Sequence, residues 1–181
     1  MKNFRKMIVG ANWKIYKKSS HEVKEFVNNL KKELAKYRTD LMDAYILPDP
    51  VSLRTLKDEL DGYPISYGAQ DVFWEDEGSY TGCISPVILW DLGCKYVFIG
   101  HSERKKYFKE TDIIINKKVH SCYRNGLLPI LLIGETLEEK NYNKTNKVLK
   151  KQLSVGLDGI PASFLSKMVI VYEPVWAIGK K

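Results

Sequence analysis

The chain has 181 residues, of which 44% are hydrophobic and 28% charged, so it is long enough for one sizeable core. No apolar run approaches the roughly 20 residues of a membrane span, and the run "MIVGA" (7–11) is too short for a signal-peptide core. The formal net charge of +7 comes from scattered lysines, not from a basic stripe with stacking aromatic residues. We therefore expect a cytoplasmic protein with a single domain over residues 1–181, and neither nucleic acid nor a membrane as partner.

Strands and helices are predicted to alternate along the chain. Six short runs rich in β-branched and aromatic residues predict strands, at Met7–Gly10, Ala44–Leu47, Ile65–Ala69, Tyr96–Ile99, Leu128–Ile133 and Val169–Tyr172. Amphipathic runs between them predict helices at about 20–36, after Pro50, at about 86–92, from an N-cap at Thr111 to Gly126, and after Thr136. Ser19 and Glu22 are spaced as a capping box for the first helix.

The strand sequences are continuously apolar, which is typical of parallel strands covered by helices. The alternation predicts an α/β fold. It fits two architectures, a doubly wound sheet or a (β/α)8 TIM barrel of which the first six strands are present. The alternation by itself does not choose between them.

The three cysteines, Cys83, Cys94 and Cys122, form no CxxC pair and no metal-binding spacing. Free cysteine commonly packs as a small hydrophobic residue. We therefore expect three reduced, buried thiols and no metal site.

Polar and ionisable residues follow the predicted strands, where parallel α/β folds place their ligands. They are Asn12 and Lys14 after the first strand, Gln70 after the third, His101, Ser102 and Glu103 after the fourth, Glu135 after the fifth and Glu173 after the sixth. A carboxylate, an imidazole and an ammonium around one small cavity suit proton abstraction next to a carbonyl. Glu173 is the candidate base, and His101, Lys14 and Asn12 are candidate donors to the developing oxyanion. That reaction needs no cofactor.

Six motifs carry a resemblance that covers essentially the whole chain: "GANWK", "GAQ", "GSYTGCISP", "FIGHSERKKYFKETD", "NGLLPILLIGETLEE" and "VYEPVWAIG". In order and approximate spacing they resemble the triosephosphate isomerase family. The resemblance implies a (β/α)8 barrel that acts as a homodimer in glycolysis and gluconeogenesis. Its substrates would be the phosphorylated sugars dihydroxyacetone phosphate and D-glyceraldehyde 3-phosphate.

The resemblance also implies roles for the residues at the strand ends. Glu173 matches the base that moves a proton between two substrate carbons, and His101 matches a neutral imidazole that polarises the carbonyl. The positive end of the short helix that begins near Ser102 would disfavour imidazolium. Lys14 matches the substrate-binding lysine, and Asn12 matches a side-chain donor to the substrate.

The same resemblance implies a lid and a dimer contact. Pro174–Trp176 match the hinge of a lid that excludes water, and Gly179 matches a lid N–H that binds the phosphate. Thr81 lies in a loop that resembles the one inserted beside the partner's active site. Ser102 and Glu103 are expected to support the site.

Other polar residues have simpler interpretations. His21, beside a helix cap, and His120, within a helix, are expected to be surface or packing residues. Glu135 and Thr136 are as compatible with the start of the next helix as with a site.

Several positions depart from the family pattern: 15–17, Asp71 in place of Asn, Cys83 in place of an acid, Leu132 in place of Cys, and Lys180 and Lys181 after Gly179. None removes the acid, the base or the electrophile. They leave open an alternative substrate, a four-carbon sugar phosphate such as erythrulose phosphate.

A second alternative concerns length. A (β/α)8 barrel needs eight strands and typically about 250 residues. If the chain ended at Lys181, it would lack the C-terminal portion of the barrel and half of the phosphate site, and we would expect a catalytically silent fragment.

Overall fold

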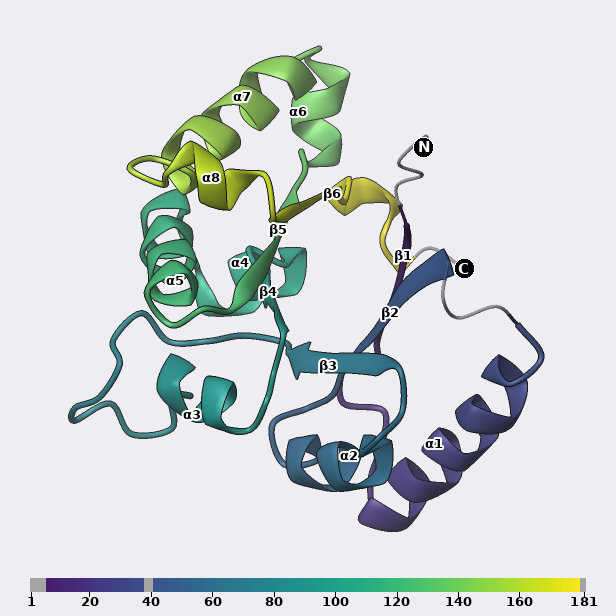
Figure 1. The fold of residues 1–181 in the computed structure, drawn as a ribbon. Coiled ribbons are helices and arrows are strands. Elements are labelled where there is room, and N and C mark those ends of the chain that lie inside the picture. The colour runs from purple at the N-terminus through teal and green to yellow at the C-terminus, as the bar shows by residue number, and fades with distance from the viewer. Residues whose placement is uncertain (1–5, 38–40, 180–181) are drawn as a thin grey trace, which may run out of the picture. The chain divides into compact units, whose positions relative to one another are not determined.

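The computed structural model describes residues 6–37 and 41–179 of the chain. In this part of the chain six strands form one sheet, and their order in the sheet is their order in the sequence (Figure 1). The strands are β1 (Met7–Asn12), β2 (Met42–Leu47), β3 (Ile65–Ala69), β4 (Tyr96–Ile99), β5 (Leu128–Ile133) and β6 (Val169–Tyr172). The predicted α/β class is confirmed, and β3 to β6 begin and end where the sequence predicts.

The strand pairs with a defined register are parallel. In β1 and β2, Asn12 pairs with Leu47, so both strands end at the same level. β2 and β3 pair from Ala44 with Ile65. In β5 and β6, Ile133 pairs with Tyr172. The segments that follow β5 and β6 therefore start next to each other.

The helices lie between the strands, as predicted, although the last predicted one is divided. They are α1 (Ser20–Leu34), α2 (Leu53–Leu60), α3 (Pro86–Asp91), α4 (Ser102–Phe108), α5 (Asp112–Arg124), α6 (Leu137–Asn141), α7 (Thr145–Gly156) and α8 (Ala162–Leu165). Between α6 and α7 the backbone of Asn143 has a φ of +54°, which ends the helix. The short α8 was not predicted.

Local capping explains where two helices begin. Thr111 Oγ1 accepts a hydrogen bond from the Ile114 N–H, which confirms the predicted N-cap of α5. At α1, Ser19 Oγ accepts from the Glu22 N–H at 3.2 Å. The Glu22 carboxylate accepts from Lys18 N–H instead of returning to Ser19, so the predicted capping box is only half formed.

The chain divides into two compact units, Met1–Gln70 with Ile88–Tyr96 and Asp71–Val87 with Val97–Lys181. In the first unit, α1 and α2 contact each other, and α2 contacts β3. Their apolar faces surround the buried Trp13, whose ring meets Phe26 edge to face with centroids 5.7 Å apart. The core of this unit consists of Trp13, Val23, Val27, Ile46, Leu56, Leu60 and Ile65.

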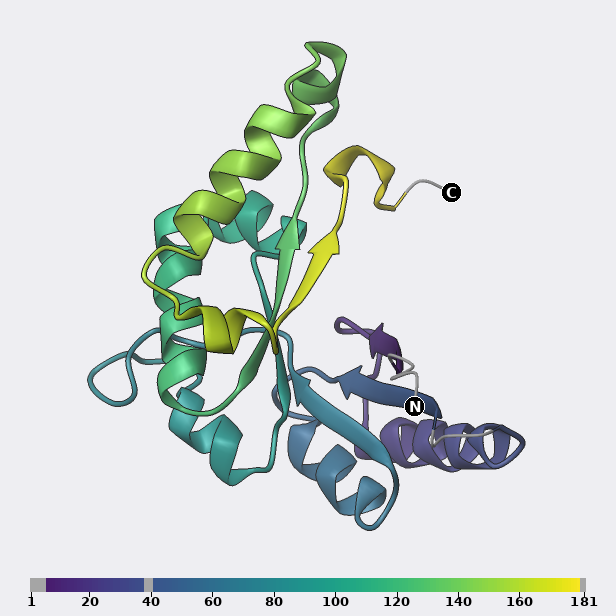
Figure 2. The same cartoon turned by 45° about the horizontal axis from the view of Figure 1, so that its top comes forward.

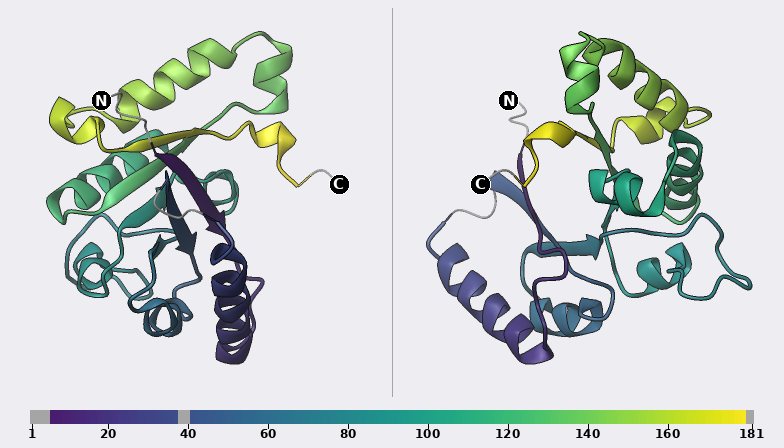
Figure 3. Two further views of the ribbon diagram at one scale, coloured as in Figure 1. Left: turned by 45° about the vertical axis from the view of Figure 1, so that its right-hand side comes forward. Right: turned by 180° about the vertical axis from the view of Figure 1, so that it is seen from behind.

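In the second unit, α5 and α7 lie side by side and both contact β5 (Figure 2). β5 is the most buried strand, because every residue from Pro129 to Ile133 is buried. The loop between β3 and α3 is tied to α5 at its base, where the Ser121 hydroxyl donates to the Phe73 carbonyl. Its tip extends away from the helices of this unit (Figure 3).

β1 and β6 are largely exposed, although their sequences are apolar. Met7 is 65% exposed and Tyr172 is 51% exposed. In the described part of the chain β1 has β2 as its one neighbour and β6 has β5, so each has an open side. An apolar sequence allows burial, but a neighbouring element must supply the cover.

The prediction of three buried thiols is correct for Cys94 and Cys122 and wrong for Cys83, which is exposed. Burial raises the pKa of the Cys94 thiol to about 12. Burial also raises the pKa of Cys122, and the neighbouring Asp71 adds to that rise.

Because the thiolate is the reactive form, a thiol-specific reagent should label the native chain rapidly only at Cys83. All three cysteines should react after denaturation in guanidinium chloride. Absorbance-based thiol counting before and after denaturation checks this. In Cys83→Ser the fast native phase should vanish, and its persistence would contradict the burial of the other two thiols.

Candidate active site

His101 and Glu173 face each other in the second unit. His101 follows β4 and caps α4, and Glu173 directly follows β6. His101 Nε2 lies 3.3 Å from Glu173 Oε1, and their side chains are 8% and 19% exposed. The structure thus brings together the two residues that the sequence nominates as electrophile and base.

The hydrogen bonding of His101 defines its tautomer. Its Nδ1 accepts a hydrogen bond from the Glu103 backbone N–H at 3.2 Å. A backbone N–H can only donate, so Nδ1 carries no proton, and in the neutral imidazole the proton is on Nε2. The N–H of His101 therefore points toward Glu173, where it can donate to an oxygen.

The Glu173 carboxylate is held by the same short helix. Its Oε2 accepts from the Ser102 backbone N–H at 3.2 Å, while Oε1 faces His101. The Glu173 backbone N–H donates to the Ile133 carbonyl at 2.7 Å, which continues the β5–β6 pairing past the end of β6. Both carboxylate oxygens are therefore positioned by the start of α4.

The end of β5 approaches the end of β6 too closely for a side chain. A Cβ at Gly134 would lie 2.0 Å from the Glu173 carbonyl oxygen. The amide of Gln152 fixes Gly134 from the other side, because it donates to the Gly134 carbonyl and accepts from its N–H. Position 134 therefore requires glycine, because a side chain would not fit. The contact of Gln152 with Gly134 was not predicted from the sequence.

Glu135 is the main site residue that the sequence left undecided. It is 1% exposed, and its carboxylate accepts from the Tyr172 hydroxyl at 3.0 Å and from Trp176 Nε1 at 2.9 Å. Burial raises the pKa of Glu135, but the hydrogen bonds from Trp176, from its own backbone and from Tyr172 outweigh burial and hold the pKa below its usual value. Glu135 therefore stays ionised and ties the segment after Glu173 to the end of β5.

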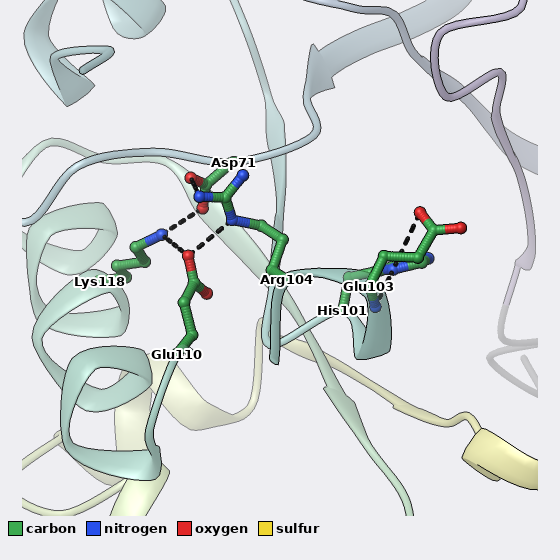
Figure 4. Close-up of polar contacts among 6 residues, drawn as sticks. All are labelled: Asp71, His101, Glu103, Arg104, Glu110 and Lys118. Atoms are coloured by element: carbon green, nitrogen blue, oxygen red, sulfur yellow. Dashed lines mark hydrogen bonds and ion pairs between the residues drawn. The ribbon is translucent and has the colours of Figure 1, made fainter. Parts of the chain in front are cut away.

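A cluster of four charged residues lies beside α4: Asp71, Arg104, Glu110 and Lys118. Figure 4 shows their side chains pointing toward one another. Arg104 pairs with Asp71 at 2.9 Å and with Glu110 at 2.6 Å. Lys118, which is 3% exposed, pairs with the same two carboxylates. The cluster connects α4 to α5 and to the beginning of the loop after β3.

The charged groups of this cluster shift the pKa of Asp71 in opposite directions. Burial raises the pKa of Asp71; Lys118 and Arg104 oppose the rise and Glu110 adds to it, with a net increase. Glu110 Oε2 is buried without a hydrogen-bond partner among the described residues. Two buried carboxylates thus share two cations. Removal of either cation would leave a buried negative charge without compensation.

The first unit holds Asn12, Lys14 and Gln70. Lys14 has a φ of +54°, a left-handed conformation that costs a non-glycine residue of order 1 kcal/mol. Asn12 Oδ1 accepts from the Lys14 N–H at 2.8 Å, and the Gln70 amide donates to the Lys14 carbonyl at 2.8 Å. The backbone of Lys14 is therefore held on both sides in a strained conformation.

The other predicted residues lie elsewhere. Thr81 is exposed in the loop between β3 and α3. Gly179, exposed and with a φ of +68°, follows the 3₁₀ helix η2 (Val175–Ala177), and the departures at Lys180 and Lys181 lie outside the described residues. His21 is exposed, and His120 Nε2 lies 2.9 Å from the Asp158 carbonyl.

Over residues 6–37 and 41–179, no three His, Cys, Asp or Glu side chains are grouped to hold a metal ion. Over the same ranges, no helix is both long and apolar enough to cross a bilayer.

Comparison with known proteins identifies the family. The sequence profile described as "Triosephosphate isomerase" matches residues 7–181. A triosephosphate isomerase of Dictyoglomus turgidum is 46% identical over 175 residues, which are 97% of this chain and 69% of that protein. The chain belongs to the triosephosphate isomerase family. Enzymes of that name from Geobacter metallireducens and Moorella thermoacetica are 46% and 42% identical.

Membership of the triosephosphate isomerase family decides between the two predicted architectures. The family profile covers all six strands, and the sequential strand order is that of a (β/α)8 barrel and not of a doubly wound sheet. The prediction of the first six strands of a TIM barrel is confirmed. The chain spans 69% of the length of the two Dictyoglomus relatives that it matches.

Replacing Gly134 by alanine should destabilise the protein, because the new methyl group meets backbone and cannot be accommodated by rotation of a side chain. We expect a loss of about 1–3 kcal/mol in the free energy of unfolding, measured with urea. Gly156→Ala, in α7, is the matched control, because its Cβ would make only ordinary contacts at 3.6 Å. Equal stability of the two variants would contradict the close approach of β5 and β6.

Replacing Lys118 by methionine should leave Asp71 and Glu110 facing each other with Arg104 alone. We expect a loss of about 3–5 kcal/mol at pH 7.5. The folded-state pKa of Asp71 is already raised and would rise further, so protonation stabilises the folded variant, and this stabilisation is lost as the pH rises through that pKa. Urea unfolding should therefore show a smaller loss at pH 5 than at pH 7.5.

The exposed neighbour Lys117 provides the control for this experiment. Its ammonium lies 5.6 Å from the Trp74 ring centroid, so Lys117→Met should cost less than about 1 kcal/mol at either pH. A pH-independent loss in Lys118→Met would contradict the proposed repulsion between the two carboxylates.

Proposed function

We propose that this chain is an aldose–ketose isomerase that interconverts dihydroxyacetone phosphate and D-glyceraldehyde 3-phosphate through an enediolate. The observation that carries the proposal is the pairing of His101 and Glu173. A carboxylate and an imidazole N–H face each other at 3.3 Å, each held by a backbone N–H of α4. Membership of the triosephosphate isomerase family supports the choice of substrate.

The proposed reaction moves one proton between neighbouring carbons. Glu173 removes the proton from the carbon next to the carbonyl, and the C–H electron pair forms the C=C bond of the enediolate. The Nε2–H of His101 donates to the developing oxyanion, which lowers the barrier most when the donor is positioned in advance. His101 Nε2 gives its proton to the former carbonyl oxygen and takes up the proton of the neighbouring hydroxyl, so that the negative charge moves to the other oxygen. That oxygen then forms the new C=O bond while the C=C electron pair takes the proton back from Glu173 at the other carbon, so the reaction has no net oxidation.

Further residues are proposed to bind the substrate. Lys14 would pair with the phosphate and the developing negative charge, and Asn12 would donate from its side chain. Gly179 would bind the phosphate through its backbone N–H. The left-handed backbone of Lys14 supports a functional role, because such strain is most common at binding and catalytic sites.

The proposal also includes the domain organisation, the oligomeric state and the cellular location. We propose a single domain over residues 1–181 that works as a cytoplasmic homodimer, with Thr81 beside the partner's site and with Ser102 and Glu103 as supporting residues. Exposed Tyr80 and Thr81 in the extended loop support a contact with a second chain.

Glu173→Gln tests the assignment of the base, since the amide keeps the shape and loses the proton acceptor. The protein should be produced in a host that lacks its own triosephosphate isomerase. We expect kcat to fall about 10²- to 10⁴-fold with an unchanged circular dichroism spectrum. Glu138→Gln, an exposed residue of α6, should keep normal kcat.

Near-normal kcat in Glu173→Gln would overturn the assignment of the base. The same assay should compare dihydroxyacetone phosphate with erythrulose phosphate at equal concentrations. A higher kcat/KM for the four-carbon substrate would overturn the choice of triose and leave the reaction type intact.

A further inference from the structure

The indole of Trp176 is held between two opposite charges. Trp176 is the middle residue of η2, three residues after Glu173. Its Nε1–H donates to Glu135 Oε1 at 2.9 Å. The ammonium of Lys140 lies 3.2 Å from the centre of the ring. One charged group therefore contacts the edge of the indole and the other contacts its face.

Each contact matches the charge distribution of the indole. The N–H edge is positive and attracts a carboxylate, while the face of the ring is negative and attracts a cation. Because the two contacts act along different directions, they restrict both the position and the orientation of the ring. Lys140 is an exposed residue of the short helix α6, and its ammonium group lies over the Trp176 ring.

Both charges come from a segment whose position is well defined. Glu135 follows β5 directly, and Lys140 belongs to α6, which begins with a complete capping box between Thr136 and Glu139. The Glu135 carbonyl also accepts from the Val175 N–H at 3.0 Å. The residues after Glu173 are thus attached to this segment through the backbone, the edge of the indole and its face.

We propose that Lys140 is a positioning residue for the isomerase reaction: through Trp176 it fixes the segment that follows Glu173, and so holds the Glu173 carboxylate against His101 and Ser102. The catalytic part of this inference rests on the proposed function. The structural part, that Lys140 fixes Trp176, can be tested without any assay of activity.

The structural test compares Lys140→Met, which keeps the length and removes the charge, with Lys140→Arg, which keeps the charge. Lys147→Met, at an exposed position of α7, is the matched control. NMR spectra are recorded on protein that carries ¹⁵N in the tryptophan and histidine side chains, with the Trp176 and His101 signals assigned from Trp176→Phe and His101→Gln. Lys140→Met should shift the Trp176 indole signal and broaden the His101 ring signal. Lys140→Arg should keep both near their original positions, and Lys147→Met should change neither.

An unchanged Trp176 signal in Lys140→Met would overturn the proposal, because the ammonium would then not fix the ring. A shifted Trp176 signal with an unchanged His101 signal would overturn the link to Glu173. The NMR outcomes test the structural role of Lys140 without any isomerase activity. If the unmodified chain shows no isomerase activity, that result counts against the proposed function alone.

The kinetic test uses the same variants and dihydroxyacetone phosphate. If Lys140 positions the base, Lys140→Met should lower kcat about 2- to 10-fold with little change in KM, since the misplacement affects the transition state more than substrate binding. Lys140→Arg should restore kcat, and any decrease of the unfolding midpoint of Lys140→Met in urea should be too small to account for its loss of kcat. An equal loss in both Lys140 variants, or a loss that follows the unfolding midpoint, would overturn the positioning role.

Discussion

The position of the candidate base depends on how closely the backbones at the ends of β5 and β6 approach each other. Gly134 leaves no room for a side chain beside the Glu173 carbonyl, and the Glu173 N–H bonds to the Ile133 carbonyl. This contact places the residue after β6 at the level of the residue after β5. The Glu173 side chain can then reach both His101 and the Ser102 N–H, which lie at the end of β4.

Two buried acidic sites stabilise this arrangement in different ways. Glu135 accepts hydrogen bonds from neutral donors, the Tyr172 hydroxyl and the Trp176 N–H, which help to hold its pKa below the usual value. Asp71 and Glu110 instead share Lys118 and Arg104. The first holds the segment after Glu173, and the second holds α4, which carries His101 at its N-cap. Both members of the candidate pair, His101 and Glu173, are thus anchored by buried carboxylates.

The sequence predicted the strands and helices better than it predicted the buried contacts that hold the candidate site together. Four strands have the predicted bounds, and His101 and Glu173 were both nominated from their place after a strand. Glu135 was left undecided because Thr136 is a true N-cap, and an acid before an N-cap has an ordinary explanation. The partners of Lys118 could not be foreseen, because Asp71 is 47 residues away and ion pairs over such distances leave no periodic pattern.

The sequence by itself determined the alternation of strands and helices, the parallel sheet and the candidate site residues at the strand ends, because these follow from local periodicity and from side-chain chemistry. Only the tertiary structure decided the tautomer of His101, the need for glycine at Gly134 and the ionised state of Glu135. Each of these depends on atoms that meet across different strands. Backbone donors, carbonyl oxygens and burial set them, and none of these is visible in the order of the residues.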